Sequence, residues 1–99
     1  MILEFHPAFA DDLVEAIHYH DSAEAGLGDD FNKEVFYTID RIKAHPLAFN
    51  KVYGEVRRAR LKRFKRYAVR FSFDEDADTI RVLSVLHGAR HPDYGKERR

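Results

Sequence analysis

The chain has 99 residues, of which 44% are hydrophobic and 34% are charged, and its 17 basic and 17 acidic side chains cancel to a formal net charge of zero. This length fits one domain, residues 1–99, with a modest core and no room for separate catalytic and regulatory domains. The absence of cysteine excludes disulfides, thiolate metal sites and cysteine nucleophiles, and it fits a reducing compartment. No window approaches the roughly 18 apolar residues of a membrane span, and residues 1–9 lack a signal-peptide pattern, so we expect a cytoplasmic protein with no membrane contact.

The charge is divided along the chain. Residues 1–50 hold ten acidic and three basic side chains, a net charge of −7, whereas residues 51–99 hold seven acidic and fourteen basic ones, a net charge of +7. Eight of the fourteen residues from Arg57 to Arg70 are Lys or Arg. We interpret this stretch as a basic patch for a polyanion or an acidic protein partner, because arginine matches the geometry of phosphate and carboxylate groups. The alternative is a charged strand edge that only opposes aggregation.

The first half of the chain predicts one strand and two helices. The apolar run Ile2–Phe5 predicts a strand that ends at the following His-Pro, because proline lacks a backbone donor. Apolar residues then recur at helical spacing over Phe9–His20. We expect the glycines of residues 26–28 to break this helix, and a second amphipathic helix to run from about Asp29 and stop before Pro46. Two helices joined by a short glycine turn predict an antiparallel hairpin.

The second half predicts three strands. Residues 46–55 have an irregular pattern that is typical of a loop. The strands are expected over Val56–Phe64, Tyr67–Phe73 and Thr79–His87, and an acidic turn joins the last two. The tail from Gly88 to Arg99 is expected to be partly disordered. The order strand, two helices, three strands predicts an α+β fold, in which a helical hairpin packs on one face of a curved, mostly antiparallel sheet.

Alternation along the strands assigns the side chains to two faces of this sheet. The face toward the helices is expected to receive mainly apolar side chains, namely Ala59, Leu61, Tyr67, Val69, Phe71, Phe73, Ile80, Val82 and Leu86. The opposite, open face is expected to receive Arg58, Arg60, Lys62, Arg70, Arg81, Leu83, Val85 and His87. The open face is therefore predicted to be basic, with a small apolar patch.

Several motifs follow one another in a characteristic order. They are Asp12-Leu13 and Tyr19-His20 in the first helix, Ile39, Ile42 and Pro46 at the end of the second, Val56–Leu61, a strand from Tyr67, and Ile80–His87 leading to Arg90-His91-Pro92. Over nearly the whole chain this set resembles the ParE/RelE superfamily of toxins of type II toxin–antitoxin systems, and above all its ParE-like, plasmid-stabilisation branch. Two departures stand out, because Phe64-Lys65-Arg66-Tyr67 replaces the usual Phe-Pro-Tyr, and Tyr94-Gly95 stands where many members have tryptophan.

The resemblance to the ParE-like branch implies a toxin that inhibits DNA gyrase by binding, without chemistry of its own and without a cofactor or metal. It also implies a cognate antitoxin, which lays a helix or strand over the exposed surface of the toxin. The residues expected to bind the antitoxin or the target are Arg58, Arg60, Lys62, Arg70, Arg81, Leu83 and Val85.

Two alternatives remain open at this stage. Resemblance to the RelE-like branch implies a metal-independent, ribosome-dependent messenger-RNA endoribonuclease, whose partners are the ribosome and mRNA. The cations expected to bind the phosphate would then be Arg58, Arg60, Lys62 and Arg90, and His87 or His91 would transfer the proton, because imidazole titrates near neutrality. The other alternative is a non-toxic RNA- or protein-binding module of the same fold.

Overall fold

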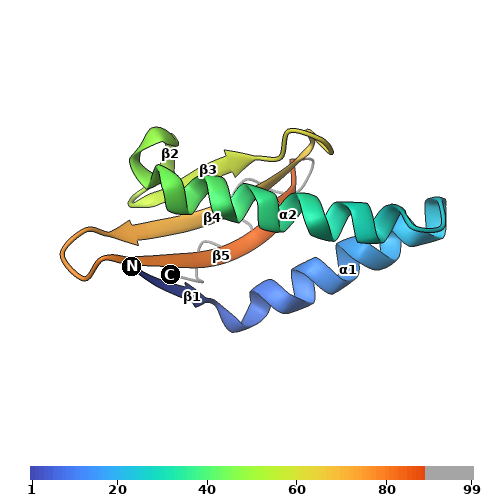
Figure 1. The fold of residues 1–99 in the computed structure, drawn as a ribbon, viewed down its shortest axis with the longest axis horizontal. Coiled ribbons are helices and arrows are strands. Elements are labelled where there is room, and N and C mark those ends of the chain that lie inside the picture. The colour runs from blue at the N-terminus through green and yellow to red at the C-terminus, as the bar shows by residue number, and fades with distance from the viewer. Residues whose placement is uncertain (89–99) are drawn as a thin grey trace.

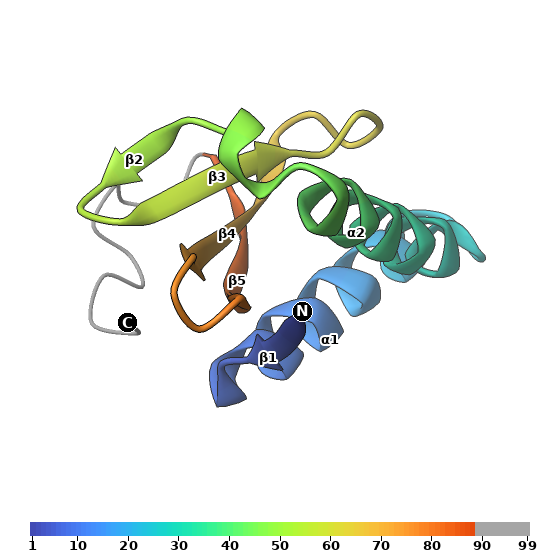
Figure 2. The same cartoon turned by 60° about the vertical axis from the view of Figure 1, so that its left-hand side comes forward.

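The computed structural model describes residues 1–88. These residues form a five-stranded sheet with the strand order β1-β5-β4-β3-β2, and two helices cover one of its faces (Figure 1, Figure 2). The elements are β1 (Ile2–Phe5), α1 (Pro7–Ala23), α2 (Leu27–Ala44), a short 3-10 turn (Pro46–Ala48), β2 (Lys51–Tyr53), β3 (Val56–Arg60), β4 (Tyr67–Asp74) and β5 (Thr79–His87). The predicted α+β fold with a helical hairpin is confirmed.

The sheet is mostly antiparallel, as predicted. Strands β2 to β5 pair in antiparallel order, and β1 pairs in parallel with β5, with Ile2 opposite Thr79. Strand β2 was not predicted, because it lies inside the expected loop of residues 46–55 and pairs irregularly with β3. Strand β3 ends at Arg60 rather than at the predicted Phe64.

The turn between the helices depends on two glycines. Gly26 has a φ of 87°, a left-handed conformation that glycine adopts without steric cost. It is the N-cap residue that directly precedes α2. A Cβ atom on Gly28 would lie 2.6 Å from the carbonyl oxygen of Ile17, so this glycine allows the two helices to approach closely. Its backbone N–H also donates to Asp21 Oδ1 at 2.7 Å. Helix α2 therefore begins at Leu27, two residues before the predicted start.

The core lies between the helices and the sheet. Helix α2 contributes Phe31, Val35, Ile39 and Ile42, and the strands contribute Ala59, Leu61, Val69, Phe71, Ile80, Val82 and Val85. The second helix is amphipathic, as predicted, and the side chain of Phe36 lies outside its buried stripe with 43% of its surface exposed. Thr38 is buried instead, and its hydroxyl donates to the carbonyl oxygen of Glu34 at 2.9 Å, which removes the cost of burying a polar group.

An aromatic cluster joins the helices to the start of β4. The His20 ring stacks on Phe31 with centroids 4.6 Å apart, and Phe64 and Tyr67 contact Phe31 edge-on at 5.2 and 4.9 Å. His20 is buried, and its Nδ1 lies 2.7 Å from the carbonyl oxygen of Ala16. These ring contacts fix the connection between β3 and β4 against the helical hairpin.

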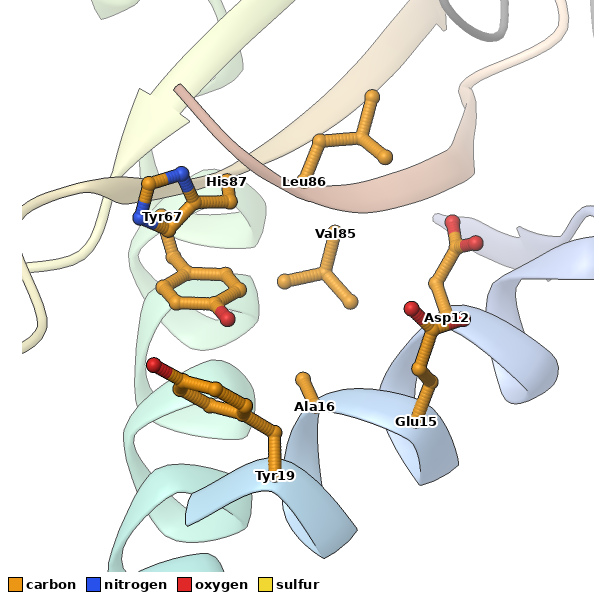
Figure 3. A pocket seen from close by; sticks show the side chains of 8 residues that line it. All are labelled: Asp12, Glu15, Ala16, Tyr19, Tyr67, Val85, Leu86 and His87. Carbon is orange, nitrogen blue, oxygen red and sulfur yellow. The ribbon is translucent and has the colours of Figure 1, made fainter. Parts of the chain in front are cut away.

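A β-bulge in β5 changes the predicted faces of its last residues. The register shifts after Arg70↔Ser84, because the next residue of β4, Phe71, pairs with Val82. Leu83 is the extra residue, and alternation is reversed beyond it. Val85 consequently belongs to the core under the helices, and Leu86 points away from them (Figure 3). The predictions that Val85 and His87 lie on the open face and that Leu86 lies on the helix face are wrong.

Candidate functional site

The open face, which is the face of the sheet away from the helices, carries a group of arginines. Arg58 and Arg60 alternate on β3 with the buried Ala59, and Arg70 alternates on β4 with the buried Val69 and Phe71. The register places Arg58 directly opposite Arg70. The sheet therefore brings the three arginines together, as predicted.

Two of these arginines lie where their charges repel. Like charges directly opposite one another on neighbouring strands destabilise a sheet. The guanidinium of Arg70 lies 5.7 Å from the centre of the Tyr53 ring, which offsets part of this repulsion through a cation–π contact. The pair is an arrangement that an anionic ligand bridging both guanidinium groups would stabilise.

Arg81 and Lys62 are the other two cations that were predicted to lie on the open face. Arg81 pairs with Glu4 of β1 and with Ser72 of β4, so a carboxylate stands on the strand beside it. Lys62 follows the end of β3, and its Nζ lies 5.8 Å from the centre of the Tyr37 ring of α2. The prediction that Lys62 lies on the open face is therefore wrong, because the chain leaves the sheet after Arg60.

The predicted apolar patch is not exposed. Leu83 is 1% exposed and Val85 is 3% exposed, and Val85 packs under the helices. The bulge in β5 explains the position of Val85. The part of the open face that the structure presents to a partner is therefore charged at Arg58, Arg60 and Arg81, all of which are exposed.

The residues predicted for ribonuclease chemistry do not share one face. His87 ends β5 on the helix side, where its ring contacts Tyr67 edge-on with centroids 5.0 Å apart. Arg60 is on the open face, and Lys62 lies against α2. Arg90 and His91 lie outside the described residues, as does the rest of the tail beyond Gly88 that was expected to be partly disordered.

A pocket of about 320 Å³ lies beside His87, between α1 and the end of β5 (Figure 3). Ala16 and Val85 form its apolar floor, the rings of Tyr19 and Tyr67 form one side, and the carboxylates of Asp12 and Glu15 form the other (Figure 3). These two carboxylates would repel a phosphate group on the pocket side of His87. Gly88, which follows His87, donates its backbone N–H to the carbonyl oxygen of Arg66 at 2.6 Å, so the backbone of a basic residue lies close by.

Neither a metal cluster nor a membrane span appears in the described part of the chain. Among residues 1–88, no three His, Asp or Glu side chains are grouped so that they could hold a metal ion. None of the helices over the same residues has the length and apolar character needed to cross a bilayer.

Acidic residues of α2, which were not predicted, hold the connection between β3 and β4. Glu34 Oε2 accepts hydrogen bonds from the backbone N–H groups of Lys62 and Arg63, at 3.0 and 2.9 Å. Asp30 pairs with the Arg63 side chain at 3.3 Å. The spacing of Asp30 and Glu34, four residues apart on one helix face, was the available signal, but their partners are about thirty residues away in the sequence.

The comparison with protein families agrees with the fold and with the motif order. Residues 3–92 match the family described as the ParE toxin of the type II toxin–antitoxin system parDE. No individual curated protein matches the chain. Since the family match extends from β1 through the whole sheet and the helical hairpin, the chain belongs to the ParE toxin family of type II toxin–antitoxin systems, a family that implies an antitoxin partner.

Proposed function

We propose that this ParE-family toxin inhibits DNA gyrase by binding to it, without chemistry of its own, and that a cognate antitoxin neutralises it. The observation that carries this proposal is the separation of the possible catalytic groups, with His87 on the helix side of the sheet and Arg60 on the open face. Phosphodiester cleavage needs a proton-transfer group and cations around one phosphate. Inhibition by binding needs only a presented surface. A gyrase target also implies action in the cytoplasm.

The open-face arginines are the proposed contact for an acidic segment of the antitoxin or of the target. Arg58, Arg60 and Arg70 come from two neighbouring strands and are spaced by the register of the sheet, so an extended or helical acidic segment can meet several of them. Hydrogen bonds between guanidinium and carboxylate groups are among the stronger polar interactions in proteins. Val85 and His87 are not part of this surface, because the bulge turns them toward the helices.

Two assays on the purified protein separate this proposal from its alternatives. The first measures supercoiling of relaxed plasmid by gyrase, and the second maps cuts in translated messages by primer extension. We expect inhibited supercoiling and intact messages. Cuts positioned by codon with unaffected supercoiling would instead establish the ribosome-dependent endoribonuclease. No effect in either assay and no growth inhibition would favour the non-toxic binding module.

A variant pair connects the supercoiling assay to the proposed surface. Arg60→Glu reverses an exposed charge on the open face, and Lys33→Glu makes the same change in charge on α2, where Lys33 pairs with Asp29 at 3.2 Å. We expect Arg60→Glu to require a higher concentration for the same inhibition, and Lys33→Glu to behave as the unaltered protein. Equal inhibition by both variants would remove the open face from the proposal.

A further inference from the structure

The connection between β3 and β4 displays a dense group of cations. We call residues Lys62–Arg66 the basic turn, and four of its five side chains are the exposed Lys62, Arg63, Lys65 and Arg66. The turn extends past the end of β3 and runs beside α2 (Figure 1, Figure 2). It lies outside the open face, so the function proposed above does not account for it.

The backbone of the basic turn is held in place at several points. Phe64 has a φ of 61°, a left-handed conformation that is uncommon for a bulky residue, and its ring is packed in the aromatic cluster with His20 and Phe31. The carboxylate of Glu34 binds the N–H groups of Lys62 and Arg63. The strained conformation persists because these contacts outweigh its cost, and it directs the neighbouring cations outward.

The four cations differ in the contacts that they make within the protein. Arg63 pairs with Asp30, and Lys62 lies over the Tyr37 ring. Within residues 1–88, neither Lys65 nor Arg66 has an acidic group within 4.0 Å. Two adjacent cations at the end of the turn are therefore presented on a fixed backbone with their charges directed to solvent.

We propose that the basic turn is a contact site for the phosphate groups of double-stranded DNA. Lys and Arg side chains that neutralise phosphates supply most of the sequence-independent affinity for nucleic acid. Proteins that bind single strands also present aromatic side chains on which bases stack, but the aromatic residue of this turn, Phe64, points into the core. The exposed ring of Tyr37 beside the turn lies against Lys62, whose Nζ is 5.8 Å from the ring centre, so the turn offers mainly cations, which suit the phosphate backbone of a duplex. Binding of DNA by the chain alone requires no gyrase, so this inference stands or falls separately from the proposed target.

The test is fluorescence anisotropy with the full chain and a labelled DNA duplex of mixed sequence, measured at several salt concentrations. Lys65→Glu combined with Arg66→Glu is compared with Lys33→Glu combined with Lys43→Glu, which makes the same change in net charge on exposed positions of α2. Loss of two phosphate contacts should make the salt dependence weaker, because the negative slope of log affinity against log salt should become shallower by about 1.8. The unaltered chain should then lose about tenfold more affinity than the turn variant between about 50 and about 200 mM salt, and the α2 variant should keep the original slope.

Three results would overturn the inference. They are absence of duplex binding by the unaltered chain, equal losses of affinity and slope in the turn and α2 variants, and tighter binding of single-stranded RNA than of duplex DNA. Circular dichroism verifies folding, and Lys65→Gln combined with Arg66→Gln replaces the charge reversal if that variant unfolds. A chain that binds DNA through the turn but leaves supercoiling unaffected would contradict the gyrase proposal alone.

Discussion

The two faces of the sheet differ in the side chains that they carry. On the helix side, the side chains of β3, β4 and β5 are almost all apolar and buried against α1 and α2. On the open face, Arg58 stands directly opposite Arg70, an arrangement that costs stability. Burial explains the apolar side chains of the first face, whereas the second face carries the exposed Arg58 and places it opposite Arg70, whose guanidinium contacts the Tyr53 ring. The comparison indicates that the helix side maintains the fold and that the open face is available for a partner.

The largest expected effect is the loss of stability when a buried side chain is removed from the helix side of the sheet. Phe31→Ala should lower the free energy of unfolding by about 3–5 kcal/mol, because the fully buried ring contacts His20, Phe64 and Tyr67. Phe36→Ala on the same helix is the matched control, and its cost should stay below about 1 kcal/mol because the side chain is 43% exposed. Urea unfolding followed by circular dichroism measures both, and equal losses would refute the assigned orientation of α2.

The second expected effect concerns the open face. Arg60→Glu should weaken binding of the antitoxin roughly 10- to 100-fold, since a hydrogen bond to a charged group contributes about 1.5–3 kcal/mol. Lys33→Glu should change the affinity by less than about threefold, because a surface charge away from the contact contributes little. Isothermal titration calorimetry with the cognate antitoxin measures both affinities. The same affinity for both variants would show that the antitoxin binds elsewhere.

A smaller effect is expected where the two regions meet. Glu34→Ala should cost about 1 kcal/mol of stability and speed hydrogen exchange at the amides of Lys62 and Arg63, because both N–H groups lose their acceptor. Asp40→Ala removes the same charge from an exposed position of α2 and should change stability by less than about 0.5 kcal/mol. Unchanged exchange at Lys62 and Arg63 in the Glu34 variant would mean that the carboxylate does not hold the basic turn.

Sequence periodicity predicted the elements well where one face of an element is apolar. The helical spacing of Phe9, Ala16 and His20 and the limits of β5 are both confirmed. The short edge strand β2 was missed because three residues with one irregular partner strand carry no period. The start of α2 was placed two residues late because Gly28, usually a helix breaker, is required there by the close approach to Ile17.

The faces of β5 show what alternation cannot detect. Around the bulge, Val82, Leu83, Val85 and Leu86 are apolar in both phases of the alternation, so one extra residue leaves little trace in the pattern. One residue did not fit strict alternation, because the polar Ser84 would have been placed between Val82 and Leu86 on the core face. The contacts that hold the basic turn could not be predicted from the sequence for a different reason. Glu34 meets Lys62 and Arg63 only through the tertiary fold.

The most direct test of the central claim, that inhibition depends on the open face and not on a histidine at the end of β5, is a growth assay of folded variants. Cells expressing His87→Ala should be inhibited as strongly as cells expressing the unaltered toxin, because His87 contributes an edge contact to Tyr67 that affects stability by about 1 kcal/mol. Arg60→Glu, expressed at the same level, should inhibit growth less. Full growth of cells that express a folded His87→Ala protein would contradict the account, because toxicity would then depend on the histidine at the end of β5.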